Sequence, residues 1–326
     1  MLSRAFQRLG GYRLSDVKLF ALQAERVSEL SPSSIQVEKS LQNLFEANLD
    51  TLLGIRFIAS EHSTGPVHGG RIDTLGLDED GCPVIIEYKR AISENVINQG
   101  LFYLDWLMDH RKDFQWLVLE RLGQEVAATI DWSAPRLLCI ASNFTRYDEH
   151  AVKQINRNIE LLRYRRFEDR YLMIELVHAP KVGRIPAPAS AENLPDTTRE
   201  SADPDAYRSQ RIDYRLANAT QPLRTLFESI TSYLTGLSDD VQTKHLKCYV
   251  AFKRIKNFVC LEIYPQAGVI TAYLKVDPST VQLENGFTRD VRKIGHFGTG
   301  DLEISIRTQE DFERAQPLFQ RAYESG

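Results

Sequence analysis

The sequence lacks the cysteine and histidine spacing of a zinc site. Its 326 residues include four scattered cysteines, Cys82, Cys139, Cys248 and Cys260, with no CxxC pair and no Cys/His cluster. Structural zinc sites use closely spaced cysteine and histidine ligands. We therefore expect no zinc, and we expect Cys139 and Cys260, which lie in apolar strand-like runs, to be buried small hydrophobic residues.

Long apolar runs and a strong net charge are also missing. No stretch approaches the roughly 20 apolar residues of a transmembrane helix. The start of the chain, MLSRAFQRLGGYRL, has no continuous apolar segment of the kind a signal peptide needs. We therefore expect no membrane partner and a cytoplasmic location. A net charge of −4 excludes a global attraction to nucleic acid, so only local basic patches would provide one.

The composition, with 43% hydrophobic and 26% charged residues, is that of a soluble globular protein. The length indicates about two domains. Between them lies a stretch rich in Pro, Ala, Ser and acids with almost no large apolar residue, which is typical of a linker. We predict an N-terminal extension over residues 1–35, a first domain over 36–178, a linker over 179–213 and a second domain over 214–326.

The first domain shows helical and strand patterns in alternation. Helical spacing predicts helices over 16–30, 35–53 and 93–110, and another over 147–158. Short apolar runs predict strands over 55–60, 71–78, 83–89, 136–142, 159–167 and 171–177, and residues 115–122 fit either a helix or a strand. This order predicts an α/β, or mixed α+β, fold in which helices flank a central mixed sheet.

The second domain begins with an amphipathic helix that carries Leu223, Leu226, Phe227 and Ile230. Four strand patterns follow, over 248–255, 257–265, 269–276 and 301–308, and a helix over 310–324 closes the chain. The pattern predicts a small α+β domain. Its glycine-rich segment from Gly295 to Gly300 is no P-loop, because no GK[ST] follows, and we expect it to form tight turns.

The sequence RIDTLGLDEDGCPVIIEYK, from Arg71 to Lys89, predicts a β-hairpin around an Asp-Gly turn. Side chains alternate faces along a strand, so Glu87 and Lys89 share a face while Tyr88 points to the other. Pairing of the two arms brings Asp73 close to Glu87. Two carboxylates and an ammonium group then meet at the end of an apolar strand.

Oxygen ligands of this kind suit Mg²⁺ or Mn²⁺, and we predict that Asp73, Glu87 and the backbone carbonyl of Tyr88 bind such an ion. The metal would lower the pKa of a bound water, and Lys89 would stabilise negative charge beside it. The alternative is a surface Glu–Lys pair at a strand end. The preceding apolar run, Val84-Ile85-Ile86, favours the functional interpretation because charges on a central strand are rarely buried without a partner.

Neighbouring helices offer further candidates. Gln99 and Tyr103 form a polar stripe after the hairpin and would position Lys89 or hold a phosphate, whereas Asn95 fits a boundary residue better. Before the hairpin, Glu46 would complete the metal site from across the sheet, with a solvated helix glutamate as the equal alternative. Glu38 is a weaker candidate on the same helix.

Two segments are candidates for nucleic-acid binding. The loop before Asp73 offers His68, Gly69, Gly70 and Arg71, where the glycines would allow close approach of a strand. A plain connecting loop is an equal alternative. Late in the first domain lies a basic cluster that would contact the phosphate backbone or simply be a solvated face, and its members are Arg157, Arg163, Arg165 and Arg166.

Asp73, Glu87-Tyr88-Lys89 and then Gln99-xxx-Tyr103 resemble the PD-(D/E)xK nuclease superfamily, although Ile72 stands where the proline of that name would be. Residues 36–178 are most similar to the nuclease domain of the NucS/EndoMS-type (DUF91) endonucleases. The resemblance implies a restriction-endonuclease-like fold, a catalytic triad of Asp73, Glu87 and Lys89, support from Gln99 and Tyr103, and Glu46 as the helix-borne acid. In NucS the nuclease domain comes last, whereas here it comes first, so mismatch specificity is not implied.

The C-terminal segment VRKIGHFGTGDLEISI and the closing helix resemble the DUF5655 domain. From the nuclease motif we expect a metal-dependent endonuclease that acts on DNA rather than on RNA. The chain could also form a homodimer. The alternatives are a non-catalytic module that binds nucleic acid or protein on the same fold, and a defence or toxin effector that is silent until a signal arrives.

Overall fold

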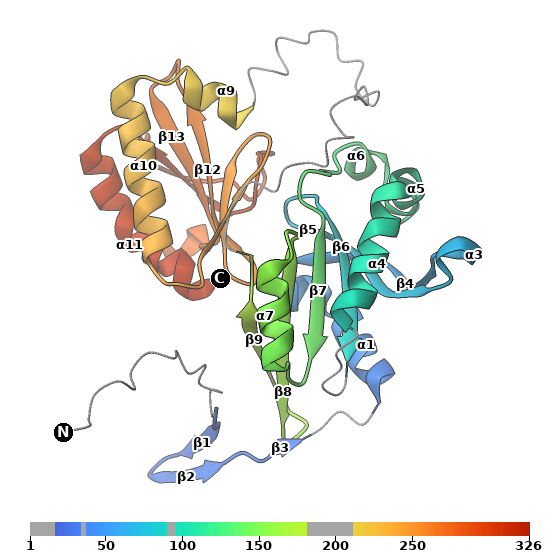
Figure 1. Cartoon of the computed structure of the whole chain (residues 1–326). Coiled ribbons are helices and arrows are strands. Elements are labelled where there is room, and N and C mark those ends of the chain that lie inside the picture. The colour runs from blue at the N-terminus through green and yellow to red at the C-terminus, as the bar shows by residue number, and fades with distance from the viewer. Residues whose placement is uncertain (1–16, 34–36, 90–95, 181–210) are drawn as a thin grey trace, which may run out of the picture.

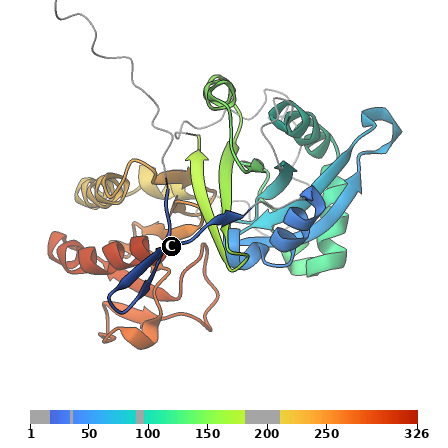
Figure 2. The ribbon, with the colours of Figure 1, turned by 90° about the horizontal axis from the view of Figure 1, so that it is seen from below.

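The computed structural model describes residues 17–33, 37–89, 96–180 and 211–326. We call residues 17–180 the N-terminal region and 211–326 the C-terminal region, and the two lie side by side (Figures 1 and 2). Each has its own sheet. No helix among the described residues is long and apolar enough to cross a membrane.

The sheet of the N-terminal region is mixed. Its strand order is β3-β8-β7-β6-β5-β4, with β9 also paired to β8, and only the β6–β7 and β7–β8 pairs are parallel. The strands are β3 (Pro32–Ser33), β4 (Ile55–Ser63), β5 (Arg71–Asp78), β6 (Pro83–Lys89), β7 (Arg136–Ala141), β8 (Ile159–Phe167) and β9 (Tyr171–His178). A mixed sheet flanked by helices was predicted, and this fold class is confirmed.

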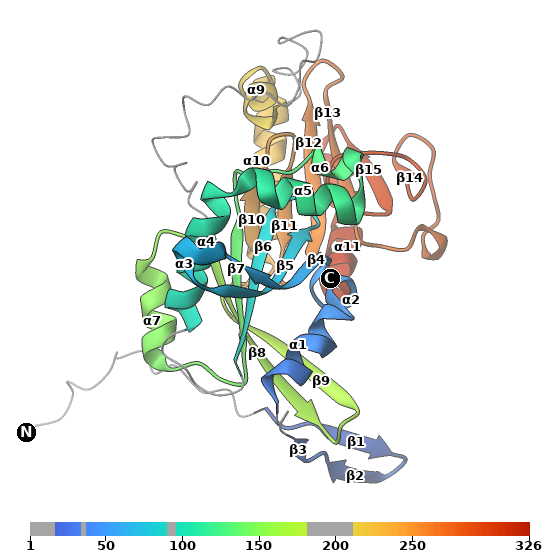
Figure 3. The same ribbon diagram turned by 90° about the vertical axis from the view of Figure 1, so that its right-hand side faces the viewer.

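Helices cover both faces of this sheet (Figures 1 and 3). One face packs against α1 (Glu38–Glu46) and α2 (Leu49–Leu53) around Phe45 and Ile86. The other face packs around Leu75 and Ile85 against α4 (Val96–Asp109), α5 (Arg111–Leu122) and α7 (Arg146–Gln154). Two short helices, α3 (Gly65–His68) and α6 (Gln124–Ala127), complete the region.

Two helix predictions need correction. The helix predicted over 16–30 is a hairpin of β1 (Phe20–Gln23) and β2 (Arg26–Glu29), which lies beyond the ends of β8 and β9 in Figure 3. Its side chains are mostly exposed, so no core selects a helical face there. The helix predicted over 35–53 is broken into α1 and α2 between Ala47 and Asn48. Gly54 ends α2 with the positive φ of 64° that favours glycine.

The C-terminal region has an antiparallel sheet in the order β10-β11-β12-β13-β15-β14. Helices α10 and α11 cover one face, and the other face is turned toward the N-terminal region (Figure 1). The strands are β10 (Gln242–His245), β11 (Val250–Lys253), β12 (Asn257–Tyr264), β13 (Val269–Leu274), β14 (Thr288–Asp290) and β15 (Leu302–Ile306). The helices are α9 (Ile212–Ala217), α10 (Gln221–Gly236), a 3₁₀ helix (Pro278–Thr280) and α11 (Gln309–Ser325).

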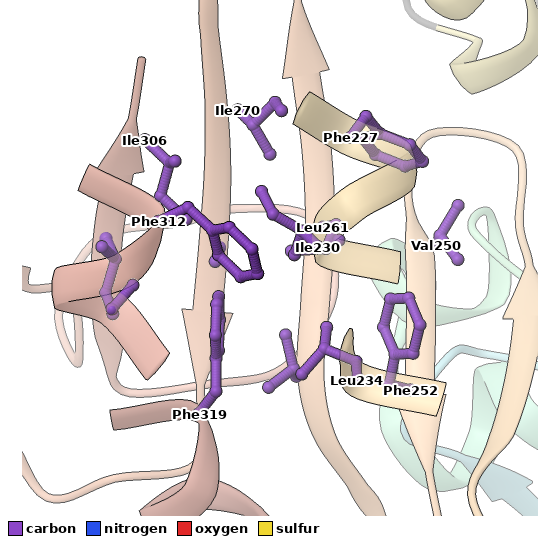
Figure 4. Packing of buried hydrophobic residues seen from close by; sticks show 14 of the residues in the cluster. Phe227, Ile230, Leu234, Val250, Phe252, Leu261, Ile270, Ile306, Phe312 and Phe319 are labelled. Atoms are coloured by element: carbon purple, nitrogen blue, oxygen red, sulfur yellow. The ribbon is translucent and has the colours of Figure 1, made fainter. Parts of the chain in front are cut away.

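The core of this region forms where the amphipathic faces of α10 and α11 meet the sheet. Figure 4 shows Phe227 and Ile230 of α10 and Phe312 of α11 against residues of β11, β12, β13 and β15. The predicted small α+β unit is thus present. Among the cysteines, Cys82, Cys139 and Cys260 are free and buried, as small hydrophobic residues would be.

Candidate active site

The β5–β6 hairpin brings Asp73 and Glu87 together as predicted. In its register Thr74 pairs with Ile86 and Leu75 with Ile85, so Asp73 falls opposite Glu87. The backbone N–H of Asp73 donates to Glu87 Oε1 at 3.2 Å, and the N–H of Tyr88 donates to Asp73 Oδ2 at 3.0 Å. Each carboxylate therefore reaches across to the other strand.

Burial makes this carboxylate pair electrostatically unfavourable. Glu87 is fully buried, and its Oε2 has no hydrogen-bond partner among the described residues. Burial and then the charge of Asp73 raise the pKa of Glu87 to about 8. Burial also raises the pKa of Asp73, although the N–H of Tyr88 opposes that shift. Glu87 is therefore mostly protonated at neutral pH beside Asp73, and a divalent cation would favour the ionised form of both groups.

Lys89 supplies positive charge beside the acid pair. Its Nζ lies 3.2 Å from Glu38 Oε1, at the start of α1. Burial lowers the pKa of Lys89, but the charge and hydrogen bond of Glu38 and the charges of Asp73 and Glu87 outweigh burial and raise it. Lys89 is therefore protonated at neutral pH, and it faces the acids as the strand alternation predicted.

Helix α1 reaches the site through Glu38, not through Glu46. Glu46 Oε1 accepts hydrogen bonds from Thr74 Oγ1 at 2.6 Å and from Gln42 Nε2 at 2.9 Å. Thr74 follows Asp73 directly, so the two side chains leave opposite faces of β5. The structure therefore corrects the sequence-based choice, because the carboxylate of Glu46 is held behind the strand that carries Asp73.

Gln42 is a site residue that the sequence analysis missed. It is buried, and its Nε2 donates to the backbone carbonyl of Asp73 at 2.7 Å. A signal was present in the sequence: Glu38, Gln42 and Glu46 recur every fourth residue, which places them on one side of α1. Within that stripe, Gln42 and Glu46 contact Asp73 and Thr74 of β5, and Glu38 contacts Lys89 at the end of β6.

Gln99 and Tyr103 hold the start of β5. The hydroxyl of Tyr103 accepts from Gln99 Nε2 at 3.0 Å and from the backbone N–H of Arg71 at 3.1 Å. The Tyr103 ring packs on Gly70, where a Cβ atom would lie 2.6 Å from Cε1. The two residues thus position the strand that carries Asp73. Their action on Lys89 stays a prediction, and Asn95 lies outside the described residues.

The predicted nucleic-acid loop forms the tip of β4, α3 and β5, which extends from the body of the region in Figure 1. His68 packs on Phe102, with ring centroids 5.1 Å apart, and Gly69 has open space around its Cα. Gly70 is covered by Tyr103, so of these two glycines Gly69 is the one that a nucleic-acid strand could approach closely. Arg71 is exposed but paired, since its Nε lies 2.5 Å from Glu61 Oε2.

Three members of the predicted basic cluster lie in β8 and have partners, whereas Arg157 precedes β8 and is exposed. Arg163 is buried and donates to Glu175 at 2.9 Å and to Asn143 at 3.1 Å. Arg165 donates to the backbone carbonyl of Val17, and Arg166 pairs with Asp169 at 2.7 Å. Arg163 is therefore buried and paired, and this structure does not place it on a phosphate-binding rim, whereas phosphate binding by Arg165 and Arg166 stays a prediction.

The acid pair fits a hard divalent cation. Among the described residues, no group of three or more His, Cys, Asp or Glu side chains is arranged to hold a metal. Mg²⁺ needs no such group, because it commonly takes one or two carboxylates and completes its shell with water and substrate phosphate. The buried, unpartnered Oε2 of Glu87 is the kind of oxygen that such an ion would satisfy.

A comparison with known protein families gives a match for the C-terminal region. Residues 212–326 match the family described as a domain of unknown function, DUF5655, so that resemblance is confirmed. Over 314 residues the chain is 27% identical to an uncharacterized protein of Haemophilus influenzae, a match that covers 94% of this chain and 99% of that protein.

Two solved structures overlap with the chain. They are a repair endonuclease from Pyrococcus abyssi, at 20% identity, and a complex of EndoMS with double-stranded DNA, at 19% identity. Each overlap covers 42% of this chain and 51% of the other chain, with a TM-score of 0.23, so the chain spans about half the length of these proteins.

Proposed function

We propose that this chain is a metal-dependent endonuclease of the PD-(D/E)xK type, with a restriction-endonuclease-like fold, that hydrolyses phosphodiester bonds in DNA. The observation that carries the proposal is the cross-strand pair of Asp73 and Glu87, with a buried carboxylate oxygen left unpartnered and Lys89 on the same face. Burying two acids together is costly unless a cation joins them. A surface Glu–Lys pair would be neither buried nor joined to a second acid.

In this proposal Asp73, Glu87 and the backbone carbonyl of Tyr88 hold Mg²⁺ or Mn²⁺. When bound, the ion supplies an activated water and neutralises charge that develops on the phosphate. Lys89 places a protonated amine beside the reacting phosphate, where it stabilises negative charge. Glu38 orients that amine through their 3.2 Å contact, so Glu38 replaces Glu46 as the helix-borne acid of the site.

The surrounding residues give the acid pair its fixed geometry. Gln42 holds the carbonyl of Asp73 from the α1 side, and Tyr103 holds the N–H of Arg71 two residues earlier. Two points of β5 are therefore fixed on either side of the Asp73 side chain. The exposed tip with His68 and Gly69 connects β4 to β5, the strand that carries Asp73. We assign this tip a contact with the nucleic-acid backbone.

The test is cleavage of supercoiled plasmid, linear duplex DNA and single-stranded RNA with Mg²⁺ or Mn²⁺. We expect Asp73→Asn and Lys89→Met to reduce the rate by about 10²-fold or more, as loss of a group that stabilises transition-state charge does. Glu46→Gln is the matched control, because it changes a carboxylate on α1 that lies behind the strand, and it should leave the rate within a few-fold. Metal-stimulated cleavage that survives both site substitutions would refute the assignment. Nucleic-acid binding without cleavage, indifferent to Asp73→Asn, would favour a binding module.

A further inference from the structure

The turn of the β5–β6 hairpin is buried under the C-terminal region. This turn carries three consecutive acids, Asp78, Glu79 and Asp80. Lys244 Nζ lies 3.0 Å from Asp78 Oδ2 and 2.9 Å from Asp80 Oδ2, and its side chain is only 11% exposed. The hydroxyl of Tyr249 donates to Asp80 Oδ1 at 2.8 Å.

Asn257, at the start of β12, and Lys275, just after β13, hold the same turn from another side. Asn257 Nδ2 donates to Asp80 Oδ1 at 2.7 Å, and the backbone N–H of Asn257 donates to Glu79 Oε2 at 2.8 Å. Lys275 forms an ion pair with Glu79. Each of the three acids is therefore bound by at least one group from the C-terminal region.

A second layer of charge lies beneath the turn. Arg136, on β7, bridges Asp78 at 3.0 Å and Glu160 at 2.6 Å, and Lys253 of the C-terminal region lies 3.3 Å from Glu160. All of these side chains are at most 5% exposed. Burial raises the pKa of Glu160, but Arg136 and Lys253 outweigh it and lower the pKa to about 2.

The charges balance only when the two regions are docked. In these ion pairs the N-terminal region contributes four carboxylates, those of the turn and Glu160, and one cation, Arg136. The C-terminal region adds three ammonium groups, those of Lys244, Lys253 and Lys275, which makes four cations for four carboxylates. Without the three ammonium groups, Asp78 and Glu160 would share the single guanidinium of Arg136, and Glu79 and Asp80 would lose their cation partners, which is costly for charges in a buried cluster.

The turn sets the register of the hairpin that carries the candidate site. Asp78 accepts from the N–H of Cys82 at 2.8 Å, and the backbone N–H of Asp78 donates to the Cys82 carbonyl at 2.9 Å. Asp73 lies about 16 Å farther along β5, at about 3.3 Å per residue. A slip of one residue in the pairing would send Asp73 and Glu87 to opposite faces.

We propose that the C-terminal region is a fixed support of the candidate active site: Lys244, Tyr249 and Asn257 are positioning residues that hold the hairpin turn and so keep Asp73 opposite Glu87. This assigns a role to a region whose family is described only as a domain of unknown function. The effect on cleavage rests on the proposed function, whereas the effect on the hairpin does not.

The test compares full-length variants by amide hydrogen exchange and by cleavage. Lys244→Met removes the ammonium group and keeps the apolar stem, while Lys244→Arg keeps the charge and is the conservative rescue. The matched control is Arg215→Met, which breaks the buried Arg215–Glu262 pair at 3.0 Å inside the C-terminal region without touching the turn. Peptides that contain Asp73 and Tyr88 report the two cross-strand hydrogen bonds directly.

We expect Lys244→Met to speed exchange in those peptides about tenfold, because opening of the hairpin then no longer has to break the ion pairs of Lys244 with Asp78 and Asp80. Cleavage should lose kcat with little change in KM, and Lys244→Arg should restore both readouts. The control should change neither, even at an equal loss of thermal stability. Faster exchange confined to residues 78–82, or equal in the control, would overturn the proposal. If the wild-type protein does not cleave nucleic acid, the hydrogen-exchange result still tests whether Lys244 positions the hairpin. If Lys244→Met fails to fold, Tyr249→Phe, which removes the hydrogen bond to Asp80, takes its place in the experiment.

Discussion

Replacing Arg136 with methionine is expected to destabilise the whole chain strongly. Arg136 is buried, and its guanidinium donates three hydrogen bonds: Nε and Nη2 to Glu160, at 3.0 and 2.6 Å, and Nη1 to Asp78, at 3.0 Å. Methionine fills much of the same volume but provides no donor. The substitution therefore leaves two buried carboxylates with less positive charge than before.

The structure sets the expected size of the loss. Breaking a buried ion pair by removing one partner costs about 3–5 kcal/mol. Here Lys253 still lies 3.3 Å from Glu160 and Lys244 still lies 3.0 Å from Asp78, so each carboxylate keeps one cation. We therefore expect the lower end of that range, about 3 kcal/mol of unfolding free energy.

Urea unfolding of the full chain, followed by circular dichroism and tryptophan fluorescence, measures this loss. The matched control is Arg254→Met, since Arg254 pairs with Asp240 at 2.9 Å but both side chains are more than a third exposed. Exposed pairs contribute about 0–1 kcal/mol. If the two probes give separate transitions, each is fitted by itself. An Arg136→Met loss no larger than that of the control would refute the view that these charges are effectively buried.

Three further outcomes are expected. Acid should lower the free energy of unfolding. The pKa of Glu160 is lowered from 4.5 to about 2, so its ionised carboxylate contributes about 3 kcal/mol of stability above pH 4.5. Urea unfolding at a series of pH values should show this contribution decrease as the pH falls toward 2. Gly70→Ala should lower cleavage, because its Cβ would collide with the Tyr103 ring, whereas Gly69→Ala, with nothing within 4 Å, should act only through its positive φ. A chain cut at a protease site inserted within residues 181–210 should elute as one species in gel filtration at low salt; separate peaks would argue against constitutive docking.

The β5–β6 hairpin could be predicted from residues that are close together in the sequence. An Asp-Gly turn and the alternation of two strands were enough to predict that Asp73, Glu87 and Lys89 share a face, and the structure places them so. Gly81 takes the positive φ, 75°, that such a turn requires. Turn chemistry and strand alternation depend on neighbours in the sequence, so the sequence alone carries this information.

Residues that meet the hairpin from elsewhere were harder to predict. Glu38 and Glu46 occupy the same stripe of α1, and only the crossing of that helix over β5 decides which of them faces the acids. Arg163 shows the same limit, since its burial against Glu175 depends on the pairing of β8 with β9. Charge by itself does not reveal whether a side chain will be solvated or paired.

The amino-acid sequence by itself determined the class of fold, the hairpin with its acid pair and lysine, and a C-terminal unit of its own. Only the tertiary structure decided that Glu38, and not Glu46, contacts Lys89, that Gln42 and Tyr103 fix β5, and that the acidic turn is buried under Lys244. The physical reason is that the first set follows from contacts between residues close in the chain. The second set depends on contacts across as many as 166 positions, which form only when helices and sheets pack.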